Sequence, residues 1–305
     1  MILNLTQNLI DALSLGSLFA LGALGIALIF GVMRLVNFAH GDYIAFCVFA
    51  MLWPSIDAAA VVFAGNLPTI ILIPLILAVG AGLSVLSEIL IFRRLRSANP
   101  ATMMIASFAL GYVIKNFLLM LFSSRPKSID LWSNLSLPIE IAGARIPLLQ
   151  VITICITIVI LIGLTAFLKR TRFGLEMRAA AENFTMARML GVKANRVIML
   201  AFAISGMLAA AIGLILATQT GTSDIQMGVS VMLVAFIATV IGGLGSLPGA
   251  VIAGFLIGGA SVLMQVILPL DARPFRDAFV YGAVIACLIW RPQGLFAPKA
   301  AKQRV

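Results

Sequence analysis

Long apolar runs separated by short polar segments dominate this chain. Several runs reach the roughly 20 residues that a helix needs to cross a bilayer. Their apolarity is continuous rather than alternating, which argues against the strands of a membrane β-barrel. We therefore predict an all-α, polytopic helix bundle of about nine spans, and counts of about eight or ten also fit because two runs are short. The predicted spans are residues 13–32, 44–63, 69–92, 103–122, 146–168, 197–218, 229–241, 250–268 and 275–290.

Composition narrows the class of protein further. Apolar residues make up 62% of the 305 residues and charged residues only 10%, whereas a soluble domain carries about 25% charged residues. So much hydrocarbon excludes both a soluble fold and an intrinsically disordered chain. One histidine and three cysteines, each cysteine within an apolar run, offer no zinc or iron site. What remains is an integral membrane protein, which we predict to be a single transmembrane domain over residues 1–305.

The distribution of positive charge indicates an orientation in the membrane. A formal net charge of +10 would suit a nucleic-acid partner, but the basic residues follow the loops between the apolar runs. With the N-terminus outside and the C-terminus cytoplasmic, the predicted cytoplasmic loops hold 15 Lys and Arg residues and the outer loops hold five. This bias matches the preference of basic residues for the cytoplasmic side. No basic residue precedes Arg34, so the first run is a retained helix rather than a cleaved signal peptide.

The longest polar segment, residues 169–196, holds seven of those cations. Apolar residues at intervals of three and four predict a short amphipathic helix, and Gly191 is placed to end it in a turn before the next span. Either this helix lies on the anionic inner leaflet, or its apolar face docks into a groove on a cytoplasmic partner. The residues of the apolar face are Phe173, Met177, Ala180, Phe184 and Ala187.

Four motifs resemble, in the same order, those of permeases from the branched-chain amino acid ABC-importer family. They are NFAHGD at residues 37–42, RFGLEMRAAAENFTMARMLGV at 172–192, IGGLGSLPGAVIAGFLIG at 241–258 and WRPQGLF at 290–296. Together they cover nearly the whole chain, and NFAHGD with GGLGSLPGA is the specific pair. The resemblance implies a transmembrane subunit of an ATP-driven importer in a bacterial-type inner membrane. With it, docking becomes the preferred interpretation of segment 169–196.

The resemblance also implies partners, because the chain carries no nucleotide-binding motif of its own. We expect no cofactor bound by this chain, which is not an enzyme; ATP is hydrolysed by two cytoplasmic ABC ATPase subunits. A second, related permease subunit is expected beside it, with a homodimer as the alternative, and an external solute-binding protein delivers the solute. The residues implied in the ATPase-coupling loop are Arg178, Ala180, Ala181, Glu182, Leu190 and Gly191.

Polar groups in or beside the apolar runs are candidates for the translocation path. NFAHGD is either a cytoplasmic hairpin, with Asn37 or Asp42 capping the second helix, or a broken element that lines the path. The glycines around Pro248 form either a tight turn or an unwound helix beside the path. Glu88 and Lys115 lie inside spans, where each charge needs a partner, and they would pair if their helices touch. The candidate path residues are Asn37, His40, Asp42, Lys115, Asn116, Gly242, Gly243 and Gly245.

Two functions from different classes fit these observations. The first is the importer permease for branched-chain amino acids or a related small polar solute; members of the family import urea, amides or aromatic acids, so the solute stays open. The alternative is an ion-coupled secondary transporter of a small solute, which needs intramembrane acids. Glu88 is the only acid well inside the predicted spans, and this scarcity counts against the alternative.

Overall fold

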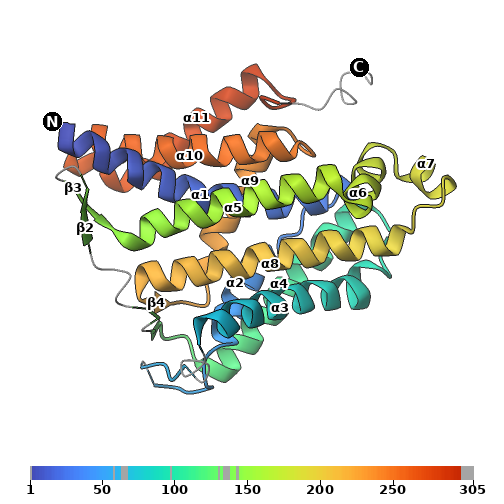
Figure 1. Ribbon diagram of the computed structural model, residues 1–305, viewed down its shortest axis with the longest axis horizontal. Coiled ribbons are helices and arrows are strands. Elements are labelled where there is room, and N and C mark those ends of the chain that lie inside the picture. The colour runs from blue at the N-terminus through green and yellow to red at the C-terminus, as the bar shows by residue number, and fades with distance from the viewer. Residues whose placement is uncertain are drawn as a thin grey trace. The chain divides into compact units, whose positions relative to one another are not determined.

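The computed structural model describes residues 2–57, 59–62, 68–96, 98–129, 131–132, 138–141 and 144–296. The chain falls into two compact units. Unit 1 comprises Met1–Ala27, Asn134–Thr165 and Leu233–Val305, and unit 2 comprises Leu28–Ser133 and Ala166–Met232. Three of the four unit boundaries fall inside helices, namely α1 (Ile2–Met33), α5 (Leu148–Arg170) and α9 (Met227–Gly242), which therefore contribute residues to both units (Figure 1).

The predicted all-α architecture is confirmed for the described residues. Six helices are long and apolar enough to cross a membrane. Their mean hydropathies over the most apolar stretch run from 1.8 to 2.9, and few charged residues interrupt them. The six are Thr6–Met33 of α1, Thr69–Phe92, Pro100–Phe122 (α4), Leu148–Arg170 (α5), Ala194–Thr220 (α8) and Leu247–Ile267 (α10). The second of them combines α3 (Thr69–Ser87) with one turn of π-helix, η1 (Glu88–Phe92).

The other three predicted spans fall on shorter helices. Helix α9 has 16 residues and α11 (Arg276–Trp290) has 15, lengths of about 24 and 22 Å at the helical rise, below the ~30 Å hydrocarbon core. The predicted helix at 44–63 is wrong in extent, because α2 (His40–Phe49) has only ten residues. After Phe49 the chain continues in tight turns, with the N–H of Met51 donating to the carbonyl of Val48 and that of Leu52 to the carbonyl of Phe49. Pro54 then keeps the helix from resuming, and the apolar residues 58–62 lengthened the run only in sequence.

Some sequence predictions lie outside the described residues. They are Phe63, the last residue of the second predicted span, and the basic C-terminal residues Lys299, Lys302 and Arg304.

Unit 1 is organised around the contact between α1 and α10. Gly254 of α10 lies against the backbone of Ala20, and Gly258 lies against that of Gly16. Glycines spaced four residues apart let two helix backbones approach closely, as predicted for this pair. A short hairpin, β2 (Pro138–Ile141) with β3 (Ala144–Pro147), precedes α5, and the 3-10 turn η3 (Leu270–Phe275) leads into α11.

Unit 2 is a bundle in which α2, α3, α4 and α8 pack side by side (Figure 1). The most extensive contact joins α3 and α8, where Gly80 and Gly206 face each other so closely that a Cβ on either would collide with the other's carbonyl oxygen. Helix α2 fills the space between α3, α4 and α8, and eight of its ten residues are buried. A helix that short and that buried is shielded from lipid by its neighbours.

The two ends of unit 2 differ in chemistry. At one end, which we call the basic end, lie η1, the short helices α6 (Arg172–Glu182) and α7 (Phe184–Met189), and the start of α8. At the opposite end, which we call the loop end, β1 (Lys127–Ser128) pairs with β4 (Thr222–Ser223) just after α8. There the buried Lys127 ammonium donates hydrogen bonds to the carbonyls of Ser55, at 2.7 Å, and Asp57. The strands β1 and β4, which pair at this end, both lie in loops predicted to be outside the membrane.

Candidate functional site

The NFAHGD motif turns the chain from α1 into α2. The Asn37 side chain accepts a hydrogen bond from the backbone N–H of Ala39 at 3.1 Å and is 1% exposed. Helix α2 begins at His40, inside the motif, and neither Asn37 nor Asp42 is its N-cap residue, which is Ala39. The predicted capping role is therefore wrong, because the helix starts one residue after Ala39 and Asn37 closes the turn before it.

The start of α2 lies deep in unit 2. His40 is completely buried, and its Nδ1 is 3.3 Å from the hydroxyl of Ser205, near the middle of α8. The backbone N–H of Phe38 donates to the hydroxyl of Ser107 on α4 at 3.2 Å. From there α2 runs toward the loop end, so that Gly213 of α8 lies against the carbonyl of Ile44. The motif therefore breaks the helical path and starts a new helix in the middle of the bundle. This matches the prediction of a broken element and not that of a hairpin on the surface.

Polar groups collect around this helix start. Ser84 and Ser87 of α3 are buried on the same side as Ser205, because Ser84 lies against Gly206. Among the described residues, His40 Nε2 and the Ser84 hydroxyl have no hydrogen-bond partner in the chain. Buried polar atoms are nearly always satisfied by protein or by ordered water. The cluster can therefore offer hydrogen bonds to water or to a polar solute.

Asp42 brings a charge to the same region. Its carboxylate lies directly against Gly111 of α4, so closely that a Cβ at this glycine would collide with Asp42 Oδ2. Lys115, one helical turn farther along α4, is the cation that acts electrostatically on Asp42. The amide of Asn116 instead donates to the carbonyl of Tyr112 on its own helix, at 2.7 Å. Of the charged candidates, the structure thus brings Asp42 and Lys115 together.

The predicted glycine-rich stretch connects α9 and α10. Gly243 and Gly245 both have positive φ, +96° and +89°, and the N–H of Ser246 donates to the carbonyl of Gly243 at 2.9 Å. The Ser246 hydroxyl then caps α10 by accepting from the N–H of Gly249. Gly242 ends α9 and packs on Gly249. The tight-turn interpretation is confirmed, and the alternative of an unwound mid-helix element is wrong.

Segment 169–196 forms two short helices instead of the single one predicted. The hydroxyl of Thr171 caps α6 by accepting from the N–H of Gly174 at 3.0 Å. Asn183 separates the two helices in an extended conformation, and its side chain caps α7 through the N–H of Met186 at 3.1 Å. Asparagine is a preferred N-cap residue, so the break has a local cause that the three-and-four periodicity concealed.

The apolar face predicted for this segment is turned inward. Met177, Ala180 and Ala187 are buried, each 2–3% exposed, and α6 packs against α8. Phe184 is half-buried, and only Phe173 is exposed. The prediction that this face is offered to a partner or to lipid is therefore wrong, because the chain itself covers it.

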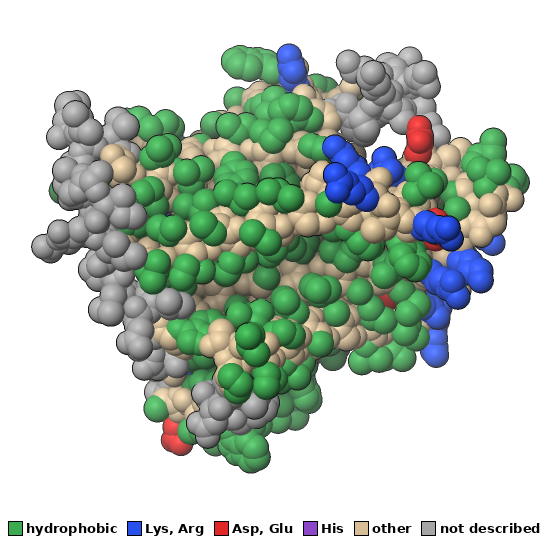
Figure 2. Space-filling model, viewed as in Figure 1, with side chains coloured by type: hydrophobic (Ala, Val, Ile, Leu, Met, Phe, Trp, Pro, Cys, Tyr) green, Lys and Arg blue, Asp and Glu red, His purple; other side chains and the backbone are tan. Residues whose placement is uncertain are grey.

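A different set of side chains is exposed on the segment. Met189 is 77% exposed and Leu190 86% exposed, beside the predicted coupling residues Arg178, Ala181 and Glu182, which are also exposed. Lys and Arg side chains gather over the same end of unit 2 (Figure 2). Gly191, with φ +89°, then turns the chain into α8, as predicted. The segment thus exposes the apolar side chains of Met189 and Leu190 among basic residues.

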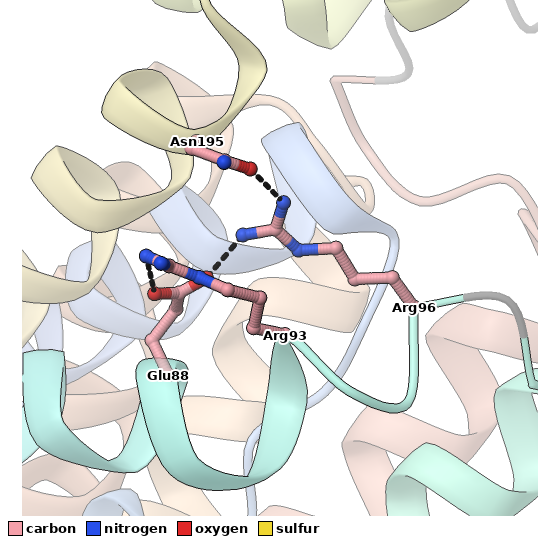
Figure 3. Close-up of polar contacts among 4 residues, drawn as sticks. All are labelled: Glu88, Arg93, Arg96 and Asn195. Carbon is pink, nitrogen blue, oxygen red and sulfur yellow. Dashed lines mark hydrogen bonds and ion pairs between the residues drawn. The ribbon is translucent and has the colours of Figure 1, made fainter.

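A buried ion-pair network anchors η1 to the start of α8 (Figure 3). Glu88 is fully buried and accepts hydrogen bonds from Arg93, at 2.8 Å, and from Arg96. Arg96 also donates to the side chain of Asn195 at 2.6 Å. The predicted pairing of Glu88 with Lys115 is therefore replaced by two arginines at the basic end.

The π-helical turn explains why sequence reasoning missed this network. The N–H of Arg93 donates to the carbonyl of Glu88 at 2.7 Å, an interval of five residues. In a regular α-helix, residues five apart lie on different faces, whereas those three or four apart meet. The wider π turn brings the two side chains onto one face. No residue pattern in the apolar run predicts this π turn.

Six apolar helices of spanning length, and a short helix buried among α3, α4 and α8, define the class: a multi-pass, helical membrane protein. The family can now be stated. Residues 8–289 match the model of the branched-chain amino acid transport system permease component, and the chain belongs to this family. It is therefore a permease component of a transport system.

Individual relatives support the assignment. The chain is 30% identical over 302 residues to the high-affinity branched-chain amino acid transport system permease protein BraD of Pseudomonas aeruginosa, covering 95% of this chain and 94% of BraD. It is 28% identical over 299 residues to LivH of Escherichia coli K12, with the same coverage. A segment of 124 residues, 39% of the chain, is 40% identical to the autoinducer 2 import system permease protein LsrC of Klebsiella pneumoniae, of which it covers 35%. No solved structure matches the chain at a significant level.

Proposed function

We propose that this chain is the permease subunit of an ATP-binding cassette importer in a bacterial-type inner membrane. It works with two cytoplasmic ABC ATPase subunits, a second related permease and an external solute-binding protein, and it binds no cofactor itself. The observation that carries the proposal is the exposed apolar tip of segment 169–196. Met189 and Leu190 stand out on a segment whose other face is packed against α8, an arrangement suited to transmitting a partner's motion to a membrane helix.

The solute we propose is a branched-chain amino acid. The names of BraD and LivH specify such solutes, and those relatives match over nearly the full chain, whereas LsrC matches over less than half of it. We place the translocation path beside the start of α2, where His40, Asp42 and Lys115 offer both charges and hydrogen bonds. A zwitterionic amino acid carries one ammonium and one carboxylate, and this pair of opposite charges is complementary to it.

Ion-coupled transport by the chain alone has less support. It requires an intramembrane acid that can bind and release an ion or proton. Glu88 is held by two arginines, Asp11 accepts a hydrogen bond from Gln150 at 2.9 Å, and Asp42 lies near Lys115. These three acids are thus engaged with other groups, whereas an ATP-driven permease needs no such acid.

Assembly with the ATPase subunits tests the proposal. Met189→Gln should weaken co-purification of the ATPase subunits with the permease by about tenfold, because burying an unpaired amide in an apolar contact costs roughly 1–3 kcal/mol. Met120→Gln is the matched control, since Met120 is 85% exposed but lies near the loop end of α4. Equal recovery of ATPase with both variants would argue against docking at this segment.

A further inference from the structure

A cavity of about 810 Å³ opens at the basic end of unit 2. The loop after η1, helix α7 and the first turn of α8 form its walls. Four of the lining residues are cationic: Arg96, Arg188, Lys193 and Arg196. No Asp or Glu is among the described residues that line it. The cavity therefore concentrates positive charge without an acid of its own.

The start of α8 adds to this charge. The N-terminal N–H groups of a helix carry a partial positive charge, so anions are stabilised there and cations are not. Lys193 is the N-cap residue of this 27-residue helix and makes no capping side-chain hydrogen bond, and Arg196 lies in the first turn. The nearest buried carboxylate, Glu88, is already held by Arg93 and Arg96. The remaining cations would repel each other unless an anion joined them.

Arg96 is fixed in place for such a ligand. One of its terminal nitrogens bonds Glu88 and the other bonds Asn195, so the guanidinium is held in one orientation at the edge of the cavity. Guanidinium groups match phosphate oxygens in geometry better than a lysine ammonium does. A preorganised arginine beside three further cations, with no acid lining the described cavity, suits a phosphate-type anion.

The helix that leads to Arg96 carries exposed apolar side chains. Leu86 and Leu90, on the turns leading to Arg93, are each 52% exposed, as expected for side chains against acyl chains. Phe184 adds an aromatic wall to the cavity itself. In the orientation that the charge bias predicts, this end of unit 2 lies at the headgroups of the cytoplasmic leaflet. Basic pockets between membrane helices on that side suit anionic headgroups.

We propose that this cavity binds the phosphate group of an anionic phospholipid from the cytoplasmic leaflet, with the acyl chains along α3 and η1. The site goes beyond the proposed transport function and depends only on the proposed orientation. The bound phosphate neutralises the cations that start α8, and it sits beside the helix that leads into Gly191. Lipid composition thereby sets how firmly segment 169–196 is held.

Lipid retention by the full chain tests the site. The chain, reconstituted in nanodiscs of phosphatidylcholine and phosphatidylglycerol and released for native mass spectrometry, should retain phosphatidylglycerol preferentially. The triple variant Arg188→Gln, Lys193→Gln, Arg196→Gln should retain at least about tenfold less phosphatidylglycerol. Each basic residue near the surface strengthens the binding of anionic lipid by about fivefold. The matched control is Lys169→Gln, Arg170→Gln, Arg172→Gln, which removes equal charge from exposed residues outside the cavity. Arg96 is kept, because it also holds Glu88.

The outcomes separate the proposed ligand from others. Selective loss of phosphatidylglycerol in the cavity variant supports the site, and equal retention in both triple variants overturns it. Thermal stabilisation by millimolar inorganic phosphate in phosphatidylcholine nanodiscs, without lipid retention, would overturn the assignment to lipid. Unchanged lipid retention with loss of ATPase binding would also overturn it and assign the cavity to the partner interface.

If the triple variant does not fold, Arg196→Gln with Arg172→Gln as its control makes the same test. Lipid retention is measured without any transport. The proposed lipid site can therefore fail while the proposed transport function holds, and the reverse.

Discussion

Gly191 shows how one residue can set the turn that ends segment 169–196. Its φ of +89° lies in a region that L-residues with a side chain rarely adopt. A Cβ built on it meets no atom within 4 Å, so the constraint is in the backbone and not in packing. A substitution should therefore alter the turn between α7 and α8 without disturbing the bundle around it.

We predict that Gly191→Val uncouples ATP hydrolysis from transport while the subunit still inserts. The strained backbone, worth about 1–3 kcal/mol, would shift the turn away from the geometry that carries motion into α8. The measurement is solute uptake per ATP hydrolysed by the reconstituted complex. Gly191→Asn is the control, because asparagine tolerates positive φ. Unchanged coupling in Gly191→Val would count strongly against a role for this turn.

Gly111 is the second residue with a specific consequence. Because a Cβ there would collide with Asp42 Oδ2, Gly111→Ala should push the carboxylate away from Lys115. We expect transport to fall by about tenfold, equivalent to roughly 1.4 kcal/mol, with unchanged expression and assembly. Gly163→Ala on α5 is the control, since a Cβ there meets nothing within 4 Å. Uptake that survives Gly111→Ala would place the solute path elsewhere.

Single charges were the hardest feature to place from the sequence. Intramembrane Glu88 was expected to need a partner, and it has one, but the partners are Arg93 and Arg96 because a π turn changes the faces of the helix. The neighbourhood of His40 was equally hidden, since Ser205 is 165 residues away in the chain. Residue types indicated which groups need partners, and only the packing of helices decides which partners they meet.

At the scale of elements, long and uninterrupted apolar runs predicted their helices well. The runs ending at Phe92 and Phe122 end as helices at those residues. Prediction failed where apolar residues continue past a helix end, as after α2, and where a cap splits a segment, as at Asn183. In both cases a local backbone signal, Pro54 or the asparagine cap, overrides the hydrophobic pattern that surrounds it.

The contact between α3 and α8 gives a prediction about stability. Gly80→Val should disrupt this contact, because the added side chain meets the backbone of Gly206; overpacking of this kind costs about 1–3 kcal/mol or more. Two residues on, Gly82 has no atom within 4 Å of a built Cβ, so Gly82→Val should change little. Thermal unfolding of the two variants in detergent measures the difference. Equal melting temperatures would contradict the close approach of the two helices.

At the scale of the whole molecule, the basic residues suggest an orientation that the bundle makes geometrically consistent. Within unit 2, segment 169–196 and the loop after η1, both predicted to be cytoplasmic, meet at the basic end, and two loops predicted to be outside meet at the loop end, where β1 pairs with β4. Charge counts use only the sequence, whereas these contacts depend on the fold. Their agreement is the reason to test the orientation directly.

Labelling with a membrane-impermeant maleimide makes that test. In a background with Cys47, Cys155 and Cys287 replaced by Ser, Arg125→Cys should react in intact spheroplasts, and Arg172→Cys should react only after permeabilisation. Both positions are exposed in the structure, so access to the reagent depends on the side of the membrane. The reverse pattern of labelling would invert the orientation.

The family and the multi-pass architecture could be predicted from the sequence, because motifs and long apolar runs are properties of the chain alone. The number of helices that cross could not, since α2, α9 and α11 are all too short to span by length. The sequence also could not predict which residues of segment 169–196 are exposed, because their exposure depends on how α6 packs on α8. Sequence periodicity identifies an apolar face but not what covers it.

Uptake by proteoliposomes tests the central claim, that separate ATPase subunits drive transport through this permease. The complex, reconstituted with its partner permease, ATPase subunits and solute-binding protein, is supplied with radiolabelled leucine on the binding-protein side and ATP on the other. We predict accumulation that requires ATP and both the ATPase subunits and the binding protein, and none on an ion gradient alone. Accumulation by this chain alone on an ion gradient, without ATP, would contradict the account.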